Sequence, residues 1–366
     1  MTAEVREPTP LRPPLSLGVL DQSPIRRGGT PREALEATLA LARAADRLGY
    51  SRYWVAEHHN SSTLASASPE LLIPLIAANT SAIRVGSGGV MLSHYSSLKV
   101  AETFRMLETL FPGRIDMGLG RAPGSDRLTA SALERGPGAL PLSAYPEQIR
   151  DVLRYMRDAV PEGHPFHGVR AIPSGESLPM PWLLGSAYDS ARFAAEQGLP
   201  FSFAHFISPD GGPKVVRAYR DQFQPSVLLA EPMVNIGVSA LCAETDEDAH
   251  RIGMSRHLMR LRRSQGRAEG GVPTIEEALA TDFSAPELDY IHYQQSLTFE
   301  GGPERVARGL REVAAEYHVD EVIVVTITHD YADRIRSYEL LAQAVGFTPR
   351  GVAGGLPGLS NEGATS

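Results

Sequence analysis

The stretch TPREALEATLALARAADRLG (30–49) decides the fold, because it predicts a helix between two strands. Thr30 and Glu33 have the spacing of a capping box, in which each residue bonds to the backbone of the other at the start of a helix. The flanking segments LSLGVL (15–20) and RYWVA (52–56) are short and apolar, which is typical of strands buried on both faces. Two such strands joined by a helix form a parallel βαβ unit.

The same alternation continues through the rest of the chain. Further helices are predicted at 68–80, 96–111 and about 331–345, and further strands at 83–92, 114–120, 181–185, 200–204, 233–241 and 320–327. Strands this apolar need cover on both faces, as in a parallel sheet between helices. Eight strand–helix units close naturally into a TIM barrel, so we predict the α/β class and a (β/α)8 barrel.

Three predicted connections, 122–144, 160–180 and 264–300, are longer than ordinary barrel loops. Insertions in the βα loops usually shape the mouth of a barrel's site. The alternative architecture is an open Rossmann sheet, for which GLGRAPG (118–124) is the best candidate motif. Pro123 stands where the third glycine of that motif belongs, so the closed barrel is favoured.

We predict one domain over 15–347 between disordered tails at 1–14 and 348–366, because both ends are rich in proline, glycine or small polar residues. The net charge of −8 argues against a nucleic-acid partner. The arginine-rich stretch 251–267 predicts an amphipathic helix with a solvated basic face. The single cysteine, Cys242, can form no internal disulfide, which suits a reducing compartment. Without an apolar run of membrane-spanning length or a signal peptide, we expect a cytoplasmic protein.

One acid and two histidines, Glu57, His58 and His59, follow the second strand. Metal ligation, acid–base chemistry and hydrogen bonding at the barrel rim are the three interpretations. Side chains alternate along a strand, so Glu57 and His59 point one way and His58 the other, which disfavours a shared metal. We therefore expect no metal, and we favour His58 or His59 as an acid–base group at the carboxyl end of the strand, where TIM barrels carry their sites.

Glycines and an arginine follow the next two strands. Gly88 and Gly89, near the end of 83–92, would let a flat ligand lie against the backbone, although a simple bend of the strand is the alternative. Arg121 directly follows 114–120 and can bind a phosphate group, although a surface ion pair would also explain it.

The start of the helix after 181–185 is a third candidate site. Free backbone N–H groups of Gly185, Ser186 and Ala187, together with the Ser186 hydroxyl, would suit a phosphate group. An ordinary helix cap is the alternative. The chain has neither a G-x-S-x-G elbow nor a P-loop, which argues against a serine hydrolase or a nucleotide triphosphatase.

Five blocks, in this order and spacing, resemble the bacterial-luciferase-like flavin-dependent monooxygenases: YWVAEHHN, IRVGSGGVMLSHY, ETLFPGRIDMGLGRAPGSD, GSAYDSARFAAEQGLPFSFAHF and GGPERVARGLREVAAEYHVDEVIVV. The similarity extends over roughly residues 15–345. It implies a TIM barrel that binds reduced FMN supplied by a separate reductase and that uses O₂ as a co-substrate.

The resemblance also implies roles for single residues. His58 matches the catalytic histidine beside the flavin ring, and we expect Glu57 or His59 to orient it. Gly88 and Gly89 match the pair that carries a non-prolyl cis peptide under the isoalloxazine. The residues that match the phosphate site are Arg121, Ser186, Ala187 and Ser190.

The implied reaction is an oxygenation. Reduced FMN and O₂ form a flavin C4a-hydroperoxide, which transfers one oxygen atom to a small organic substrate. Gly120 stands where light-emitting members carry a reactive cysteine, which favours oxygenation over light emission. An aromatic polyketide of natural-product biosynthesis is one substrate class we consider. The alternatives are an F420-dependent oxidoreductase of the same barrel family and a non-catalytic flavin-binding protein.

We also expect a homodimer. Ile73 in the second predicted helix, and Leu98 and Met106 in the third, add apolar surface beyond the stripe that faces the barrel. Members of the family associate through these two helices, so the resemblance implies an isologous contact here. Cover by the insertion 264–300 is the alternative.

Overall fold

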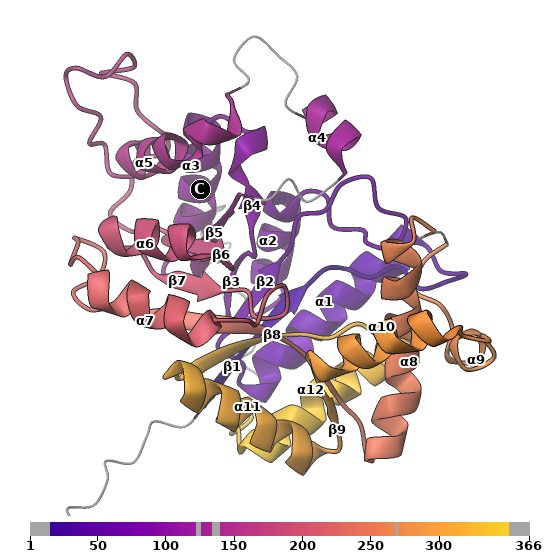
Figure 1. The fold of residues 1–366 in the computed structure, drawn as a ribbon. Helices are drawn as coiled ribbons and strands as arrows, with labels where there is room; N and C mark the ends of the chain where they lie inside the picture. Colours follow the sequence, from indigo (N-terminus) through magenta and orange to yellow (C-terminus); the bar gives the residue numbers. More distant parts are fainter. Residues whose placement is uncertain (1–14, 122–125, 134–139, 268–269, 351–366) are drawn as a thin grey trace, which may run out of the picture.

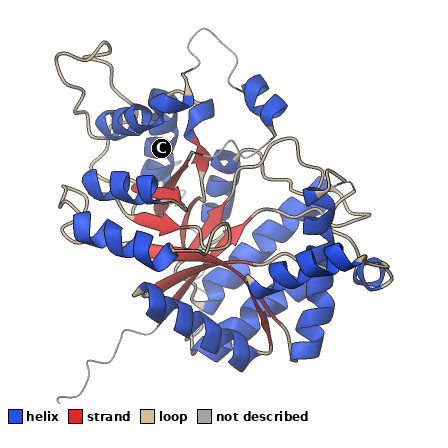
Figure 2. Ribbon diagram, in the orientation of Figure 1, coloured by secondary structure: helices blue, strands red, loops and turns tan. Residues whose placement is uncertain are grey.

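The computed structural model describes residues 15–121, 126–133, 140–267 and 270–350, and in it parallel strands form a closed barrel surrounded by helices (Figures 1 and 2). β10 pairs with both β1 and β8, which closes the sheet. This confirms the predicted (β/α)8 barrel. Its strands in spatial order are β1 (Ser16–Asp21), β2 (Arg52–Val55), β3 (Arg84–Ser87), β5 (Ile115–Gly120), β6 (Met180–Gly185), β7 (Phe201–Phe203), β8 (Val234–Cys242) and β10 (Glu321–Val325).

Two short strands differ from the sequence prediction. The strand predicted at 83–92 is interrupted after Ser87, and its second part, β4 (Val90–Met91), pairs with β5. β9 (Thr298–Gly301), at the end of the insertion predicted at 264–300, was not predicted and pairs in parallel with the carboxyl half of β8. β9 therefore extends one side of the barrel beyond its mouth.

Helices lie outside the strands in Figure 2. Thr30 and Glu33 form the predicted capping box at the start of α1. α8, α9 and α10 lie together beside the carboxyl half of β8 and β9, at the right of Figure 1. The helices around the barrel are α1 (Pro31–Leu48), α2 (Pro69–Ala78), α3 (Ser97–Leu110), α5 (Tyr145–Met156), α6 (Tyr188–Glu196), α7 (Gly212–Gln222), α11 (Pro303–Tyr317) and α12 (Tyr331–Val345). The helices in the predicted insertions are α4 (Arg127–Leu133), α9 (Ile275–Leu279) and α10 (Ala285–Ser296), and α8 (Asp246–Ser264) comes directly before the last insertion.

Charged side chains fill the amino end of the barrel interior. The buried carboxylate of Asp116 accepts bonds from Arg52 Nη1 at 2.6 Å, Arg84 Nε at 2.8 Å and Trp54 Nε1 at 2.9 Å. Arg52 Nε also bonds to Glu321 at 2.8 Å. The Arg52 guanidinium lies 4.7 Å from the ring centroid of Trp182. This network closes the end of the barrel opposite the carboxyl ends of the strands.

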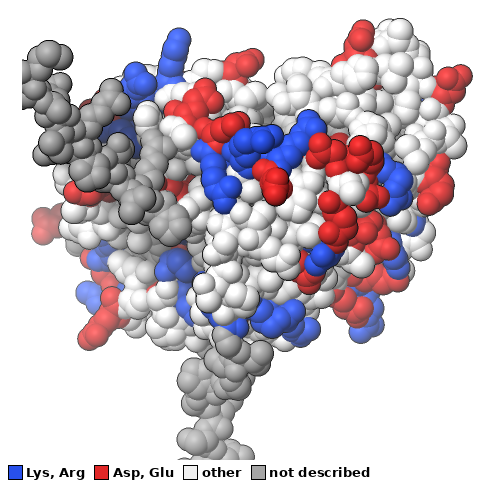
Figure 3. Space-filling view, turned by 90° about the horizontal axis from the view of Figure 1, so that it is seen from below, with Lys and Arg blue, Asp and Glu red and all other residues white. Residues whose placement is uncertain are grey.

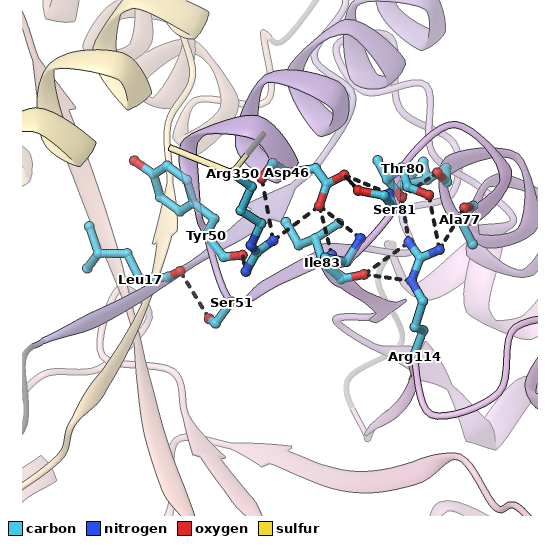
Figure 4. A network of polar contacts seen from close by, with 12 residues as sticks. Leu17, Asp46, Tyr50, Ser51, Ala77, Thr80, Ser81, Ile83, Arg114 and Arg350 are labelled. Carbon is cyan, nitrogen blue, oxygen red and sulfur yellow. Dashed lines mark hydrogen bonds and ion pairs between the residues drawn. The ribbon is translucent and has the colours of Figure 1, made fainter. Parts of the chain in front are cut away.

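A second polar network joins α1 to the segment before β3 (Figure 4). Both oxygens of Asp46 accept backbone N–H bonds, from Ser81 at 2.6 Å and Ile83 at 2.8 Å among others. Burial would raise the pKa of Asp46, but these bonds outweigh it and lower that pKa. Arg350 donates to Asp46 Oδ1 at 3.1 Å and to the carbonyl oxygen of Tyr50. Arg350, which the sequence assigns to a tail, is thus held against the barrel; 1–14 and 351–366 lie outside the described residues.

The residues that form the exposed apolar surface of α2 and α3 are not all the ones predicted. Ile73 is fully buried and Leu98 packs against the core, because both face the barrel side of their helices. Met106 is 55% exposed, as expected of a surface residue. Leu71 on α2 and Leu110 on α3 are 71% and 61% exposed. The exposed apolar face of the two helices therefore consists of Leu71, Leu75, Met106 and Leu110.

Acidic and basic side chains are interspersed on the face of the molecule drawn in Figure 3. Among the described residues, every helix is too short or too polar to cross a lipid bilayer.

Candidate active site

A cavity of about 540 Å³ lies at the carboxyl ends of the barrel strands. Strands on all sides of the barrel contribute to its wall, through Leu20, Trp54, Gly120, Leu184, Gly237 and Ile323. Its size falls within the range of small-molecule and cofactor sites. Its position is the one at which TIM barrels carry their chemistry.

Gly88 and Gly89 form part of this wall, and the peptide bond between them is cis. A Cβ atom on Gly89 would lie 2.8 Å from the carbonyl oxygen of Gly118 and 2.7 Å from Leu184 Cδ1. A Cβ atom on Gly88 would lie 2.7 Å from Leu20 Cδ1. A side chain at Gly89 would collide with the backbone, and one at Gly88 would have to displace the end of Leu20. The backbone itself is therefore the surface that a ligand meets.

The start of α6 lies on the same cavity, which Gly185, Ser186, Ala187 and Ser190 all line. Ala187 is the N-cap and offers no side-chain acceptor to the first turn. The Ser190 hydroxyl donates to the carbonyl oxygen of Ala187 at 2.7 Å. The first N–H groups of a helix have no partner within it, so those of α6 are left for a ligand.

Arg121 also lines the cavity, with an exposed side chain. Arg192 and Asp189 add one charge of each sign, so the charged groups of the wall sum to a positive value. Tyr145, at the start of α5, places a buried hydroxyl in the same wall, and within the described residues that hydroxyl has no hydrogen-bond partner. Burial raises the pKa of Tyr145, and Arg121 opposes the shift. A neutral phenol beside an arginine can donate to an anion.

Glu57 and His59 form a pair beside the cavity. His59 Nε2 lies 2.7 Å from Glu57 Oε1, which also accepts from the Tyr95 hydroxyl at 2.8 Å. The other oxygen of Glu57 accepts from the backbone N–H of Met91, a residue of the cavity wall, at 2.9 Å. Glu57 is fully buried. These bonds tie the end of β2 to β4 and thereby fix the position of the Gly88–Gly89 segment.

β2 ends at Val55, so His58 lies beyond the strand and the side-chain alternation of a strand does not set its direction. Its Nδ1 is buried and has no hydrogen-bond partner in the described part of the chain. Glu57 and His59 bond to each other, and an orienting role of either residue toward His58 stays a prediction. His58 is also absent from the wall of the cavity as the structure describes it.

The surroundings of His58 keep its imidazole neutral. Burial lowers its pKa to about 4, and the positive charge of Arg263 adds to this effect. At neutral pH the ring is therefore uncharged, with one nitrogen free to accept a hydrogen bond or a proton. In the described residues, no three His, Cys, Asp or Glu side chains come together as metal ligands do.

Residues 15–321 match the family model described as luciferase-like monooxygenase. The chain belongs to this family.

Two curated relatives of this luciferase-like monooxygenase are from Bacillus subtilis (strain 168). The uncharacterized protein YwcH is 46% identical, over 90% of this chain and 99% of its own. An N-acetyl-S-alkylcysteine monooxygenase is 35% identical, over 90% of this chain and 98% of its own. Among solved structures, apo-MsnO8 has a TM-score of 0.81 and 38% identity, covering 92% of this chain and all of the other.

More distant structures share the fold of this luciferase-like monooxygenase. The oxygenating constituent of 3,6-diketocamphane monooxygenase from Pseudomonas putida, solved with FMN, has a TM-score of 0.65 at 18% identity and covers 90% of this chain and 98% of its own. An F420-dependent secondary alcohol dehydrogenase, solved with an F420-acetone adduct, has a TM-score of 0.67 at 14% identity, with 90% and 99% covered.

In this luciferase-like monooxygenase, the structure brings together every residue predicted to bind the cofactor. Gly88, Gly89 and Arg121, and the α6 residues with them, come from three strand ends and line one cavity. Sequence reasoning missed Tyr145 and Met91. Tyr145 lies directly after an insertion without a motif, and its place in the wall depends on how α5 packs on α3, for which the sequence carries no signal.

Proposed function

We propose that the protein is a monooxygenase that binds reduced FMN in the cavity at the barrel mouth. The observation that carries this proposal is the convergence of Gly88–Gly89, Arg121 and the start of α6 on one cavity. The residues fit the cofactor. A planar ring can lie on the bare backbone of Gly88 and Gly89, where a Cβ atom would collide. A phosphate group can bond to the α6 N–H groups, Arg121 and the unpartnered hydroxyl of Tyr145.

Bound reduced FMN would supply the electrons for O₂ activation and for the insertion of one oxygen atom into the substrate. The chain itself orients the ring and excludes water. Leu20, Trp54 and Ile323 give the cavity an apolar wall that keeps bulk water from the reacting atoms. In this proposal His58 is the catalytic base, since its buried, neutral ring can accept a proton at neutral pH.

The substrate is proposed from the relatives. One of them is named for its action on N-acetyl-S-alkylcysteine, so an S-alkylated amino-acid derivative is the first compound to test. Its thioether sulfur would accept the oxygen atom. An aromatic polyketide stays a prediction, because no residue of the cavity wall singles it out.

Anaerobic titration with reduced FMN and reduced F420, each followed by addition of O₂ and N-acetyl-S-methylcysteine, tests the function. We expect saturable binding of reduced FMN and an oxygenated product found by mass spectrometry. Hydride transfer from reduced F420 without O₂ uptake would establish the oxidoreductase alternative. Flavin binding without turnover would establish a flavin-binding protein. The chain with FMN and NADH alone should not turn over, because we propose that a separate reductase supplies the reduced cofactor.

Replacing Arg121 by alanine should weaken the binding of reduced FMN by about 1.5–3 kcal/mol, the usual value of a charge-assisted hydrogen bond. Calorimetric titration under anaerobic conditions measures the loss. Arg170→Ala is the matched control, since this exposed arginine does not line the cavity. An unchanged dissociation constant in Arg121→Ala would place the phosphate elsewhere.

We further propose a homodimer whose isologous contact is formed by the exposed apolar face of α2 and α3. Four large apolar side chains on two adjacent helices favour burial against a second copy. Leu71→Glu should convert the dimer to a monomer near 39.5 kDa in light scattering. Leu128→Glu, which changes an 82% exposed leucine on α4, should leave the dimer intact. A wild-type monomer at micromolar concentration would refute the proposal.

A further inference from the structure

α8 lies against the inner face of the strands that extend beyond the barrel mouth. Ser239 follows the cavity residue Gly237 by two positions on β8, so both point to the same side of the strand. Arg256 of α8 bonds to the Ser239 hydroxyl at 2.6 Å and to the hydroxyl of Thr298, the residue paired with Ser239 on β9, at 2.9 Å. The prediction of a solvated basic face for this helix is therefore wrong for Arg256, which is 4% exposed.

Arg256 differs from the other buried arginines of the described chain. Arg105 bonds to the carboxylate of Asp158, and Arg334 bonds to that of Asp21. Arg256 bonds to neutral hydroxyls. A buried cation without a carboxylate in contact is costly, and burial accordingly lowers the pKa of Arg256 to about 9.

Glu300, the carboxylate whose charge acts on Arg256, is in contact with other groups. His257 Nε2 lies 3.1 Å from one of its oxygens, and His250 Nδ1 lies 3.7 Å from the other. Glu300 acts on Arg256 only through space. Both carboxylate oxygens of Glu300 are therefore in contact with histidines, and the guanidinium of Arg256 forms no direct ion pair with it.

Two more arginines continue from Arg256 along the same face of α8. Arg260 and Arg263 follow at the i+4 and i+7 positions, which place all three on one stripe of the helix. Arg260 bonds to the amide oxygen of Gln294. Arg263 is exposed and close enough to His58 to lower its pKa. Exposure increases from Arg256 through Arg260 to Arg263, so this arginine row runs from the inner face of β8 toward solvent.

We propose that the arginine row of Arg256, Arg260 and Arg263 binds a carboxylate group of the organic substrate, so that the substrate of this protein is an acid. Arg256 contacts β8 two residues beyond the cavity residue Gly237, so the arginine row begins next to the described cavity wall, to which none of the three arginines itself belongs. The carboxylate compensates the repulsion among the three cations and fixes the rest of the molecule in front of His58. This inference rests on the proposed function only for the identity of the ligand as a substrate.

Calorimetric titration with three acids and their matched amides tests the inference: N-acetyl-S-methylcysteine, hexanoate and benzoate. We expect at least one acid to bind about tenfold or more tightly than its amide, the ratio that one charge-assisted hydrogen bond supplies. Arg260→Gln and Arg263→Gln should each weaken that acid about 10- to 100-fold and abolish the preference over the amide.

Arg262→Gln is the matched control, because Arg262 faces away from the row and pairs with Glu277 at 2.7 Å. It should bind the acid like the wild type. As an independent readout, NMR titration should show that the bound acid raises the pKa of His58, because the negative charge of the acid offsets the positive charge of Arg263. Thermal unfolding of each variant separates lost binding from lost folding.

Equal binding of every acid and its amide by the wild type would overturn the inference, as would unchanged acid binding in both Arg260→Gln and Arg263→Gln. The same titrations without flavin separate this inference from the proposed function. Acid preference in a protein that fails to bind reduced FMN would leave the arginine row intact and refute the monooxygenase.

Discussion

Replacing His58 by alanine should lower turnover about 10²–10⁴-fold, the usual loss when a general acid–base group is removed. The Nδ1 atom of His58 is buried and has no hydrogen-bond partner in the described part of the chain. Reduced FMN should still bind nearly as in the wild type, because the proposed contacts of the cofactor lie at other strand ends. Single-turnover kinetics with pre-reduced FMN measure the effect on the chemical step.

The pH dependence supplies a second readout for His58. With its pKa lowered to about 4, the imidazole is neutral over the physiological pH range. Turnover that depends on His58 as a base should therefore decrease only as the pH falls toward 4. Stability follows the same sign. The imidazole binds a proton near pH 6.5 in the unfolded chain and only near pH 4 in the folded chain. The free energy of unfolding therefore decreases as the pH falls from about 6.5 to about 4.

His292→Ala is the matched control for His58, since this histidine is exposed on α10. It should retain full turnover. Activity of His58→Ala within a factor of about three of the wild type would be far smaller than general-base loss and would make His58 structural.

Replacing Asp116 by alanine should destabilise the fold by about 3–5 kcal/mol, the cost of removing one partner of a buried ion pair. The carboxylate is the shared acceptor for Arg52, Arg84 and the indole of Trp54. Without it, the guanidinium of Arg52 stays inside the barrel with Glu321 as its remaining acid. The shift of the urea midpoint at constant slope measures the loss.

Asp289→Ala is the control for this change, because it removes an exposed carboxylate on α10 for which surface substitutions predict an effect within about 0.5 kcal/mol. A midpoint for Asp116→Ala equal to that of Asp289→Ala would show that the barrel end tolerates an unpaired Arg52. The turnover of folded Asp116→Ala should be close to normal, since the cavity lies at the other end of the barrel.

The barrel was predictable because its information is local. The capping box of Thr30 and Glu33 and the apolar strands can be recognised from neighbouring residues. The right-handed connection of βαβ units then determines how successive strands and helices are arranged. β9 was not predictable, because Thr298–Gly301 is short and mixed in character and becomes a strand only by pairing with β8. The ordered position of Arg350 was missed for the same reason. Its bonds to Asp46 and Tyr50 join residues that lie about three hundred positions apart in the sequence.

The candidate site was predictable where a glycine, a strand end and a helix start mark it. Gly88, Arg121 and Ser186 carry such signals, and all three line one cavity. The orientation of Ile73 was predicted wrongly, because on α2 the inward stripe is wider than the periodicity suggests. The burial of Arg256 was also missed. Its hydroxyl partners lie on β8 and β9, and pattern analysis places arginine in water by default.

The two tryptophans give the molecule a built-in optical probe. Trp54 and Trp182 are the only ones in the chain, and their rings meet edge to face, 5.3 Å apart, inside the barrel. Trp54 is part of the cavity wall, and a Cβ atom on Gly88 would lie 3.0 Å from the Cβ atom of Trp54. All intrinsic tryptophan fluorescence of this protein therefore originates beside the cavity. A flavin that settled on Gly88 and Gly89 would quench it by energy transfer, so occupancy can be followed without a label and without turnover.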